Sequence, residues 1–353
     1  MRLRNLPPVL LLLVVVLVAL ISGCSSVDDQ LADYQARLSR VLEEQTAPQS
    51  VTRVPRRPVQ HNRLPLPQAD INLLELLRLD QCRIGLTVAQ KNSSLGRMAL
   101  PSQQLRLELE LLTHGPACVT ALEAAGDAAL AAKLASALAQ KQAARLHYWW
   151  NAWPGSDEWQ QFSGSHAPLD WDVQEPAALE STLLALDFAL VQAGQLERDE
   201  LAAALQGSDR LETHLQQLGQ GKLLGHWLSS AYVLIPALHQ SAALLEQRLQ
   251  RGGLCPAGKP TASAKILQNV FVKFYVGQVQ PYLAVTDRIG RELLPRLEEL
   301  ALFRPEAPAG FYDWLAELQR IRTELAQANQ RHVKAWQAQL RQCGMMPGQQ
   351  SGG

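Results

Sequence analysis

The chain has 353 residues, of which 47% are hydrophobic and 19% are charged, and its 33 basic and 33 acidic side chains give a formal net charge of +0 at pH 7. This balance argues against a nucleic-acid partner, because nucleic-acid-binding domains usually carry a strong positive charge. The length is sufficient for one large domain or two smaller ones with hydrophobic cores of their own.

The N-terminus has the pattern of a secretory signal. Two arginines lie within residues 1–4, an uninterrupted apolar run covers residues 9–21, and small residues precede Cys24. A membrane-spanning helix needs about 20 apolar residues, so an uncleaved membrane helix is the weaker alternative. The pattern predicts a signal peptide over residues 1–23 that is removed from the mature protein.

Cys24 lies where the lipobox of bacterial lipoproteins places the cysteine that is lipidated and becomes the first residue. The alternative is an ordinary secretory signal that happens to end beside a cysteine. We expect acyl chains on Cys24 to hold the protein in a membrane. In Gram-negative lipoproteins an aspartate after this cysteine favours the inner membrane, whereas this chain has Ser25. The expected location is therefore the periplasmic face of the outer membrane, with the inner membrane less favoured.

The rest of the chain is dominated by the good helix formers Leu, Ala, Gln, Glu and Arg, and β-branched runs are rare. This composition predicts an all-α protein. A tether and a first helix are expected over residues 24–46, because Leu31, Tyr34, Leu38 and Leu42 recur at helical spacing.

An arm over residues 47–69 follows, with five prolines, four arginines and no acidic residue. Proline removes a backbone donor and restricts the residue before it, so we expect an extended strap or spacer. Its arginines are candidates for contact with anionic lipid headgroups or a partner, because the arm follows the anchor closely. Ion pairs with the helical body and simple solvation are the alternatives. These arginines are Arg53, Arg56, Arg57 and Arg63.

An N-terminal helical subdomain is expected over residues 70–153. Asp70 is placed to cap a helix that continues through Ile84, and Pro101 opens another helix. Residues 105–112 alternate between apolar and polar as a strand would, but their Leu, Arg and Glu side chains favour a helix.

Residues 154–176 are enriched in Gly, Ser, Pro and Asp, which indicates a connecting loop. A C-terminal helical subdomain is expected over residues 177–344, followed by a disordered tail at 345–353. A heptad-like series over residues 224–245 predicts a long helix, which Pro236 should kink or split.

A second heptad-like series over residues 311–328 predicts the last long helix. The run 270–276 has the composition of a strand, but a lone strand would lack a pairing partner, so we expect a buried helix there. Together these patterns predict an elongated multi-helix bundle made of two packed helical subdomains.

Four cysteines besides Cys24 predict two disulfides, because the compartment outside the inner membrane is oxidising. Three pairings are possible, and we favour the one that keeps each bridge within one half of the chain. A zinc site is the alternative, but no two of the four have the close spacing of zinc ligands. No metal and no cofactor is therefore expected. The favoured bridges are Cys82–Cys118 and Cys255–Cys343.

Five of the eight tryptophans fall within 23 residues. A tryptophan ring offers a flat apolar face and one donor, which suits a glycan, a small amphiphile, a lipid headgroup or a partner protein. The more common role of such a cluster is to fill the core where two helical subdomains meet. The five residues are Trp149, Trp150, Trp153, Trp159 and Trp171.

Catalytic motifs are weak. The eight histidines are scattered and none lies in an H-E-x-x-H pattern. The segment 163–166 contains Ser and His but lacks the G-x-S-x-G elbow. Asp170 and Asp172 lie in an expected loop, where solvated or capping carboxylates are common. We therefore expect a non-catalytic protein, with a dispersed active site as the weakest hypothesis.

Several segments together resemble a known family. Cys82, the Lys-Asn-Ser-Ser-Leu-Gly run at 91–96 and the Pro-Ser-Gln run at 101–103 are similar to the core signature of the gammaproteobacterial lipoproteins grouped as domain of unknown function 3080. Residues 55–57 and 279–283 are similar to members as well. The resemblance implies an exported lipoprotein of uncharacterised activity, without established catalytic residues.

The sequence therefore favours a lipid-anchored binding or adaptor protein of the cell envelope, with an envelope protein as its partner. The alternative function is capture of a small amphiphile or glycan in a groove lined by the tryptophans from Trp149 to Trp171.

Overall fold

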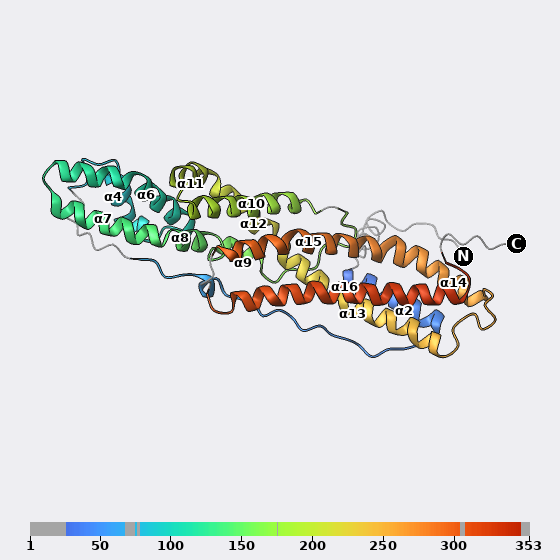
Figure 1. Ribbon diagram of the computed structural model, residues 1–353. Helices are drawn as coiled ribbons and strands as arrows, with labels where there is room; N and C mark the ends of the chain where they lie inside the picture. Colours follow the sequence, from blue (N-terminus) through green and yellow to red (C-terminus); the bar gives the residue numbers. More distant parts are fainter. Residues whose placement is uncertain (1–25, 68–74, 76–77, 175, 304–307, 347–353) are drawn as a thin grey trace, which may run out of the picture.

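The computed structural model describes residues 26–67, 75, 78–174, 176–303 and 308–346, and all regular structure in these residues is helical. The prediction of an all-α protein is confirmed. The molecule is elongated, and the chain runs along it more than once (Figure 1). Cys24 and Asp70, the expected lipidation site and the expected helix cap, lie outside the described residues.

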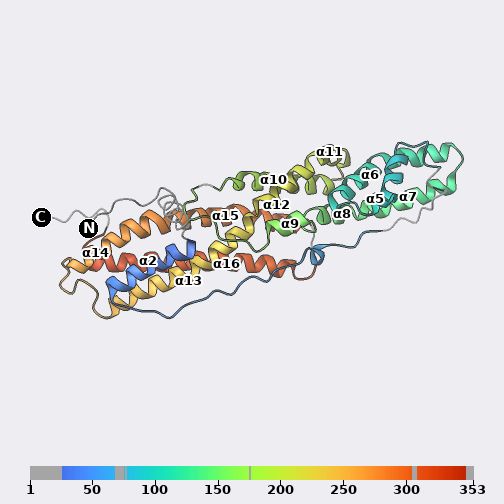
Figure 2. The same ribbon diagram turned by 180° about the vertical axis from the view of Figure 1, so that it is seen from behind.

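Two groups of helices form opposite ends of the molecule, as Figures 1 and 2 show. The distal tip (residues 78–143) contains α4 (Gly85–Asn92), α5 (Ser94–Arg97), α6 (Pro101–Ala124) and α7 (Ala128–Ala143). The proximal bundle contains α2 (Val27–Leu42), α13 (Leu223–Gln250), α14 (Ala262–Val270), α15 (Gln280–Leu302) and α16 (Phe311–Gln342). Between them lie α8 (Arg145–Ala152), α9 (Asp157–Phe162), α10 (Ala178–Glu197), α11 (Leu201–Gly207), the short helix η2 (Ser208–Arg210) and α12 (Leu211–Gly221).

The apolar residues form two separate cores. The larger core extends from α2 through the central helices to α16, and α13 packs along both α2 and α16 within it. The smaller core lies in the distal tip and is built from residues between Leu79 and Leu134. Each core buries one apolar face of its helices, which is the main stabilising term available to amphipathic helices.

Two local features, the segment before α4 and the proline in α13, bear on the predicted helices. The helix expected to run through Ile84 is wrong over residues 78–84, which form turns before α4 begins. These turns bury both Leu79 and Ile84 in the smaller core. In one straight helix, two residues five positions apart would point to different faces. Pro236 lies inside α13, which continues through it to Gln250.

The strand-like run at 270–276 is helical, as expected, but the expectation that it is buried is only partly correct. Val270 ends α14, and the rest of the run lies in a π-helical segment, η3 (Phe271–Val279), which joins α14 to α15. Only one side of this segment is buried, through Tyr275 and Val279, whereas Val272 and Val276 are exposed. The segment 154–176 is mostly irregular but contains α9.

The arm is an extended strap, interrupted by one short 3₁₀ turn, η1 (Val59–Asn62). It runs from the end of α2 along the outside of the proximal bundle to the distal tip (Figures 1 and 2). The Val54 N–H donates to Tyr232 Oη at 2.8 Å, and Arg320 Nη2 donates to the Thr52 carbonyl at 2.8 Å. The arm is therefore attached to the helical body rather than being a free spacer.

A buried polar chain fixes α2 against α16. Trp336 Nε1 donates to Tyr34 Oη at 2.8 Å, so the Tyr34 hydroxyl donates its own proton to His332 Nε2, also at 2.8 Å. His332 is fully buried, and burial lowers its pKa to about 3. The imidazole is therefore neutral in the folded protein at neutral pH.

His332 should make the fold sensitive to mild acid. Its pKa is about 3 when folded and about 6.5 when unfolded, so below pH 6.5 the unfolded chain binds a proton that the folded chain does not. The free energy of unfolding should fall by up to about 1.4 kcal/mol per pH unit from this residue. Urea unfolding between pH 7 and pH 5, above the range where most carboxylates titrate, should show a shallower pH slope for His332→Gln. Equal slopes would contradict this assignment.

Four of the clustered tryptophans lie in the larger core. Trp149, Trp150, Trp153 and Trp159 are at most 1% exposed, whereas Trp171 is half-buried beside the Tyr282 ring. The indole N–H groups find internal acceptors: Trp149 donates to the Ala189 carbonyl at 3.1 Å and Trp153 to Gln192 Oε1 at 3.2 Å. These side chains are thus packed and hydrogen-bonded within the protein.

Replacing a buried member of this cluster should destabilise the protein strongly. We expect Trp153→Ala to lower the free energy of unfolding by about 3–5 kcal/mol, the usual cost of truncating a buried aromatic side chain. Trp171→Ala is the matched control and should cost clearly less, because part of that ring already contacts solvent. Chemical denaturation of both variants measures the difference, and similar small losses in both would show that Trp153 does not support the core.

Candidate functional site

The predicted disulfides are both present. Cys82, in the turn before α4, is bonded to Cys118 on α6, with their Cα atoms 5.4 Å apart. Cys255, after α13, is bonded to Cys343 at the end of α16, with a Cα separation of 5.2 Å. The first bridge closes the distal tip and the second closes the proximal bundle.

The clustered tryptophans do not line one open groove. Trp149, Trp150 and Trp153 are completely buried, so they have no surface left for a ligand. Trp159 lines a cavity of about 150 Å³ beneath the arm, together with Trp314 of α16. This volume is below the roughly 300–1,000 Å³ of ordinary small-molecule pockets.

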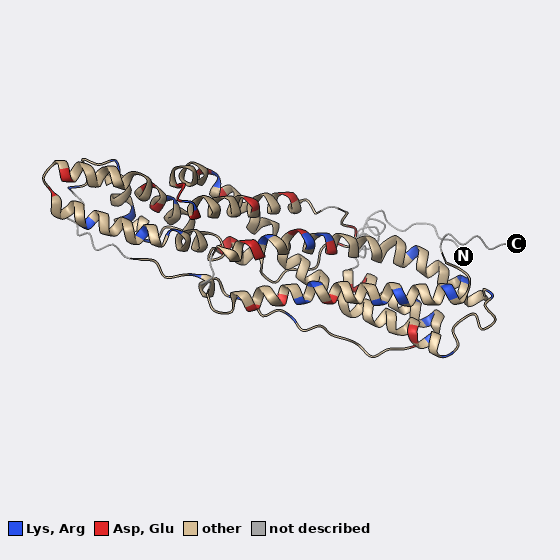
Figure 3. Cartoon of the chain, in the orientation of Figure 1, with Lys and Arg blue, Asp and Glu red and all other residues tan. Residues whose placement is uncertain are grey.

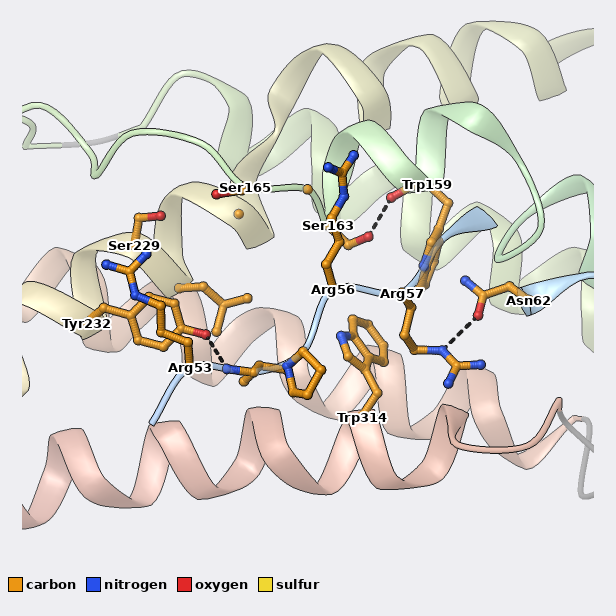
Figure 4. Close-up of a pocket in the computed structure, with 15 residues that line it drawn as sticks. Arg53, Arg56, Arg57, Asn62, Trp159, Ser163, Ser165, Ser229, Tyr232 and Trp314 are labelled. Atoms are coloured by element: carbon orange, nitrogen blue, oxygen red, sulfur yellow. Dashed lines mark hydrogen bonds between the residues drawn. The ribbon is translucent and has the colours of Figure 1, made fainter. Parts of the chain in front are cut away.

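Three of the four arginines of the arm, Arg53, Arg56 and Arg57, line this small cavity (Figure 4). Arg57 donates to Asn62 Oδ1 at 3.0 Å and to the Ala309 carbonyl at 3.1 Å. The Arg53 guanidinium lies over the Tyr232 ring, 5.3 Å from its centroid. These two side chains hold the arm to the body.

The other two arginines differ from each other. Arg63 donates to the Gly155 carbonyl at 3.0 Å and lies 4.0 Å from Asp157. Arg56 is exposed and has no ion pair or hydrogen bond with the described part of the chain. Contact of the arm with anionic lipid stays a prediction, and Arg56 is the arginine best placed for it.

A larger cavity of about 480 Å³, which we call the lysine cavity, lies within the distal tip. It brings together Lys91 from α4, Glu108 from α6 and Lys141 from α7, with Tyr148 of α8 beside them. Lys141 Nζ lies 3.0 Å from Glu108 Oε1 and 2.8 Å from Glu108 Oε2, and Lys91 forms an ion pair with the same carboxylate. Lys141 Nζ is also 3.5 Å from the Tyr148 hydroxyl.

These charges are removed from solvent to different degrees. The Glu108 side chain is 1% exposed, Lys141 is buried, and Lys91 is 30% exposed. Burial, followed by repulsion from Lys141, lowers the pKa of Lys91 to about 6. Two amino groups therefore share one carboxylate inside a largely apolar cavity.

Sequence reasoning did not single out these three residues. Lys91 belongs to the run at 91–96 that carries the family resemblance, but a single lysine in such a run looks like an ordinary surface residue. Glu108 gave a clearer signal, because it lies between leucines at 107 and 109 in a segment whose neighbours are nearly all buried. A carboxylate at the centre of an apolar run needs a buried partner.

The distal tip also exposes large apolar side chains. Leu86, Leu95 and Met98 are each 83–84% exposed, and Leu100 is exposed as well. Leu95 borders a groove of about 560 Å³ that is lined by residues of α5, α6, η2 and α12. Four such residues within the segment 86–100 form the most concentrated exposed apolar set in the described residues.

Neither a metal site nor a membrane-spanning helix is supported in the described residues. No group of three His, Cys, Asp or Glu side chains is placed to hold a metal ion in these residues. The stretch Leu201–Gln250 is long and apolar enough to include a membrane-spanning helix, but most of its apolar window is buried inside the bundle. It is therefore best explained as core.

Comparison with known proteins identifies a family. A family model described as "Protein of unknown function (DUF3080)" matches residues 31–347, from α2 to just beyond α16. No curated protein and no solved structure matches the chain. Because the family model covers most of the chain, including the arm, both disulfides and the lysine cavity, the protein belongs to the DUF3080 family.

Proposed function

We propose that the protein is a non-catalytic adaptor of the bacterial cell envelope, anchored to a membrane by lipidated Cys24 and binding a protein partner through its distal tip. The observation that carries the proposal is the set of exposed apolar side chains at residues 86–100, at the opposite end of the molecule from α2 (Figure 1). Exposed apolar side chains concentrated beside a groove are typical of interaction sites.

The start of α2 supports an anchor held close to the body. Ser26 caps this helix by accepting the Asp29 N–H, and Asp29 in turn accepts the Ser26 N–H at 3.0 Å. Cys24 is only two residues before this cap, and α2 is packed into the proximal bundle through Leu31, Tyr34 and Leu38. Acyl chains on Cys24 would therefore hold the proximal bundle near the membrane surface.

The charge of the proximal bundle also suits contact with an anionic membrane surface. Residues 247–286 contain five basic and no acidic residues, and the ribbon at this end of the molecule carries several Lys and Arg positions (Figure 3). Two of the five, Arg248 and Arg251, pair with Glu43 and Glu44 after α2. The remaining three are Lys259, before α14, Lys265 on α14 and Lys273 on η3. The same two helical segments expose apolar side chains, such as Ile266 and Val272. Basic and apolar side chains together favour an anionic lipid surface.

The lysine cavity does not by itself indicate catalysis. A general base needs a carboxylate or amine that can accept a proton from a substrate. Glu108, the one acid among the described residues that line the cavity, is already paired with both Lys91 and Lys141. The Lys91 amine, with a pKa of about 6, could accept a proton, but one basic amine without a free carboxylate beside it defines no reaction, so we assign the cavity a binding role.

The anchor can be tested by changing the cysteine and its neighbour. Cys24→Ser should remove the acyl-chain mass from the N-terminal peptide of the protein, because serine has no thiol to carry the lipid. Ser25→Asp should keep the protein lipidated but shift it toward the inner membrane in sucrose-gradient fractions. A wild-type protein whose Cys24 carries no acyl mass would refute the lipid anchor.

The adaptor role predicts a partner that contacts the tip. A photo-crosslinking residue at Leu95 in the full-length protein should capture the same envelope protein reproducibly, whereas one at Leu302, which is 73% exposed on α15, should not. With the purified partner, Leu95→Glu should weaken binding at least tenfold, because a charge would enter an apolar contact, and Leu302→Glu should have no effect. Identical capture from both positions, or none from Leu95, would contradict the proposal.

A further inference from the structure

The lysine cavity has the size and lining of a small-molecule site. Its volume of about 480 Å³ lies within the usual range for such pockets. Most of its wall is apolar and is supplied by the end of the arm, α4, α6 and α7. The wall residues are Leu66, Val88, Leu111, Leu134, Ala137 and Leu138.

The polar groups of the cavity have an excess of positive charge. Lys91 and Lys141 face a single carboxylate, that of Glu108. Arg97 of α5 also lines the cavity, is exposed, and has no ion pair with any residue that the structure describes. Keeping both lysines protonated beside one acid in a largely apolar site is costly, and a further negative charge would offset that cost.

An acidic group bound beside the lysines would supply that charge. A neutral sugar would need many more hydrogen-bonding partners than these leucine-rich walls offer, and a cation would be repelled. A ligand with an acidic head and an alkyl chain matches both the charge and the walls. We propose that the lysine cavity binds a single-chain acidic amphiphile, whose head group pairs with Lys91 and Lys141 and whose chain packs on the leucine walls.

This site also predicts how binding depends on pH. Without a ligand, the pKa of Lys91 is about 6 because of burial and the nearby Lys141, so this amine is mostly neutral at pH 8. A bound anion favours the ammonium form, so binding takes up a proton and should weaken as the pH rises from 6 to 8. The other charged or titratable groups that face Lys91 are Glu108, Lys141, Arg97 and Tyr148.

The proposal does not depend on the adaptor role and can be tested with defined ligands. The chain from Ser25 onward contains every described helix and both disulfides, and calorimetry can measure its binding of dodecanoate, dodecyl phosphate, dodecanol and inorganic phosphate. We expect one amphiphile per protein for the two acids, binding at least tenfold tighter than dodecanol or inorganic phosphate, and tighter for dodecanoate than for octanoate. Tighter binding of dodecanoate would identify the preferred head group as a carboxylate, and tighter binding of dodecyl phosphate would identify it as a phosphate. Equal binding of dodecanol, or equal binding of inorganic phosphate, would overturn the proposal.

Two lysine variants separate a ligand-binding role from a structural one. Lys91→Met should weaken binding of both acids at least tenfold and remove the pH dependence of dodecanoate binding. It should not lower the melting temperature, because Lys141 still pairs with Glu108 after the second amine is gone. The matched control is Lys133→Met on α7. The Lys133 ammonium pairs with Glu75 at 2.8 Å outside the cavity, so its replacement should leave binding unchanged. Wild-type affinity in Lys91→Met, or equal losses in both variants, would refute the site.

Discussion

The extended arm is the constraint on which the rest of the molecule depends. Its prolines prevent a helix, so its backbone donors and acceptors must find partners outside the arm or contact solvent. Tyr232 of α13 and Arg320 of α16 supply partners along the proximal bundle. Asn151 of α8 supplies two more, because its Oδ1 accepts the Leu64 N–H at 2.7 Å and its Nδ2 donates to the Leu64 carbonyl at 2.9 Å. The arm is thereby attached to the helical body at several points between α2 and the distal tip.

This arrangement gives the tryptophan-rich segment a structural role. Trp150 Nε1 donates to the Asn62 carbonyl at 2.6 Å, and Asn62 Nδ2 donates to the Pro154 carbonyl at 3.1 Å. The Trp150 ring also packs on Phe311, at the start of α16, with centroids 4.8 Å apart. The cluster therefore forms the surface on which the arm turns from the proximal bundle toward the tip, which accounts for its burial without a ligand.

Local patterns predicted the helices well, because helix propensity and apolar spacing act within a few residues. The face of α2 that carries Leu31, Tyr34 and Leu38 and the opening of α6 at Pro101 could be inferred in this way. The two disulfides were predicted on other grounds, from the even number of cysteines and the preference for bridges within one half of the chain. The lysine cavity could not be inferred, because Lys91, Glu108 and Lys141 come from three helices that meet only after the tip folds. The attachment of the arm was equally hidden, since it depends on single polar side chains such as Tyr232 and Asn151 that carry no periodic signal.

The two proposed binding surfaces share structural elements. α4 and α5 contribute Lys91 and Arg97 to the lysine cavity, and the same two helices expose Leu86 and Leu95 toward solvent. Both helices are short and are tied to α6 by the Cys82–Cys118 bridge just before them. Leu66, near the end of the arm, forms part of the cavity wall, so the arm joins this site to the end of the molecule that begins with α2. An amphiphile that shifts α4 and α5 would change the surface offered to a partner, and thermodynamic linkage then requires the partner to change the affinity for the amphiphile by the same factor.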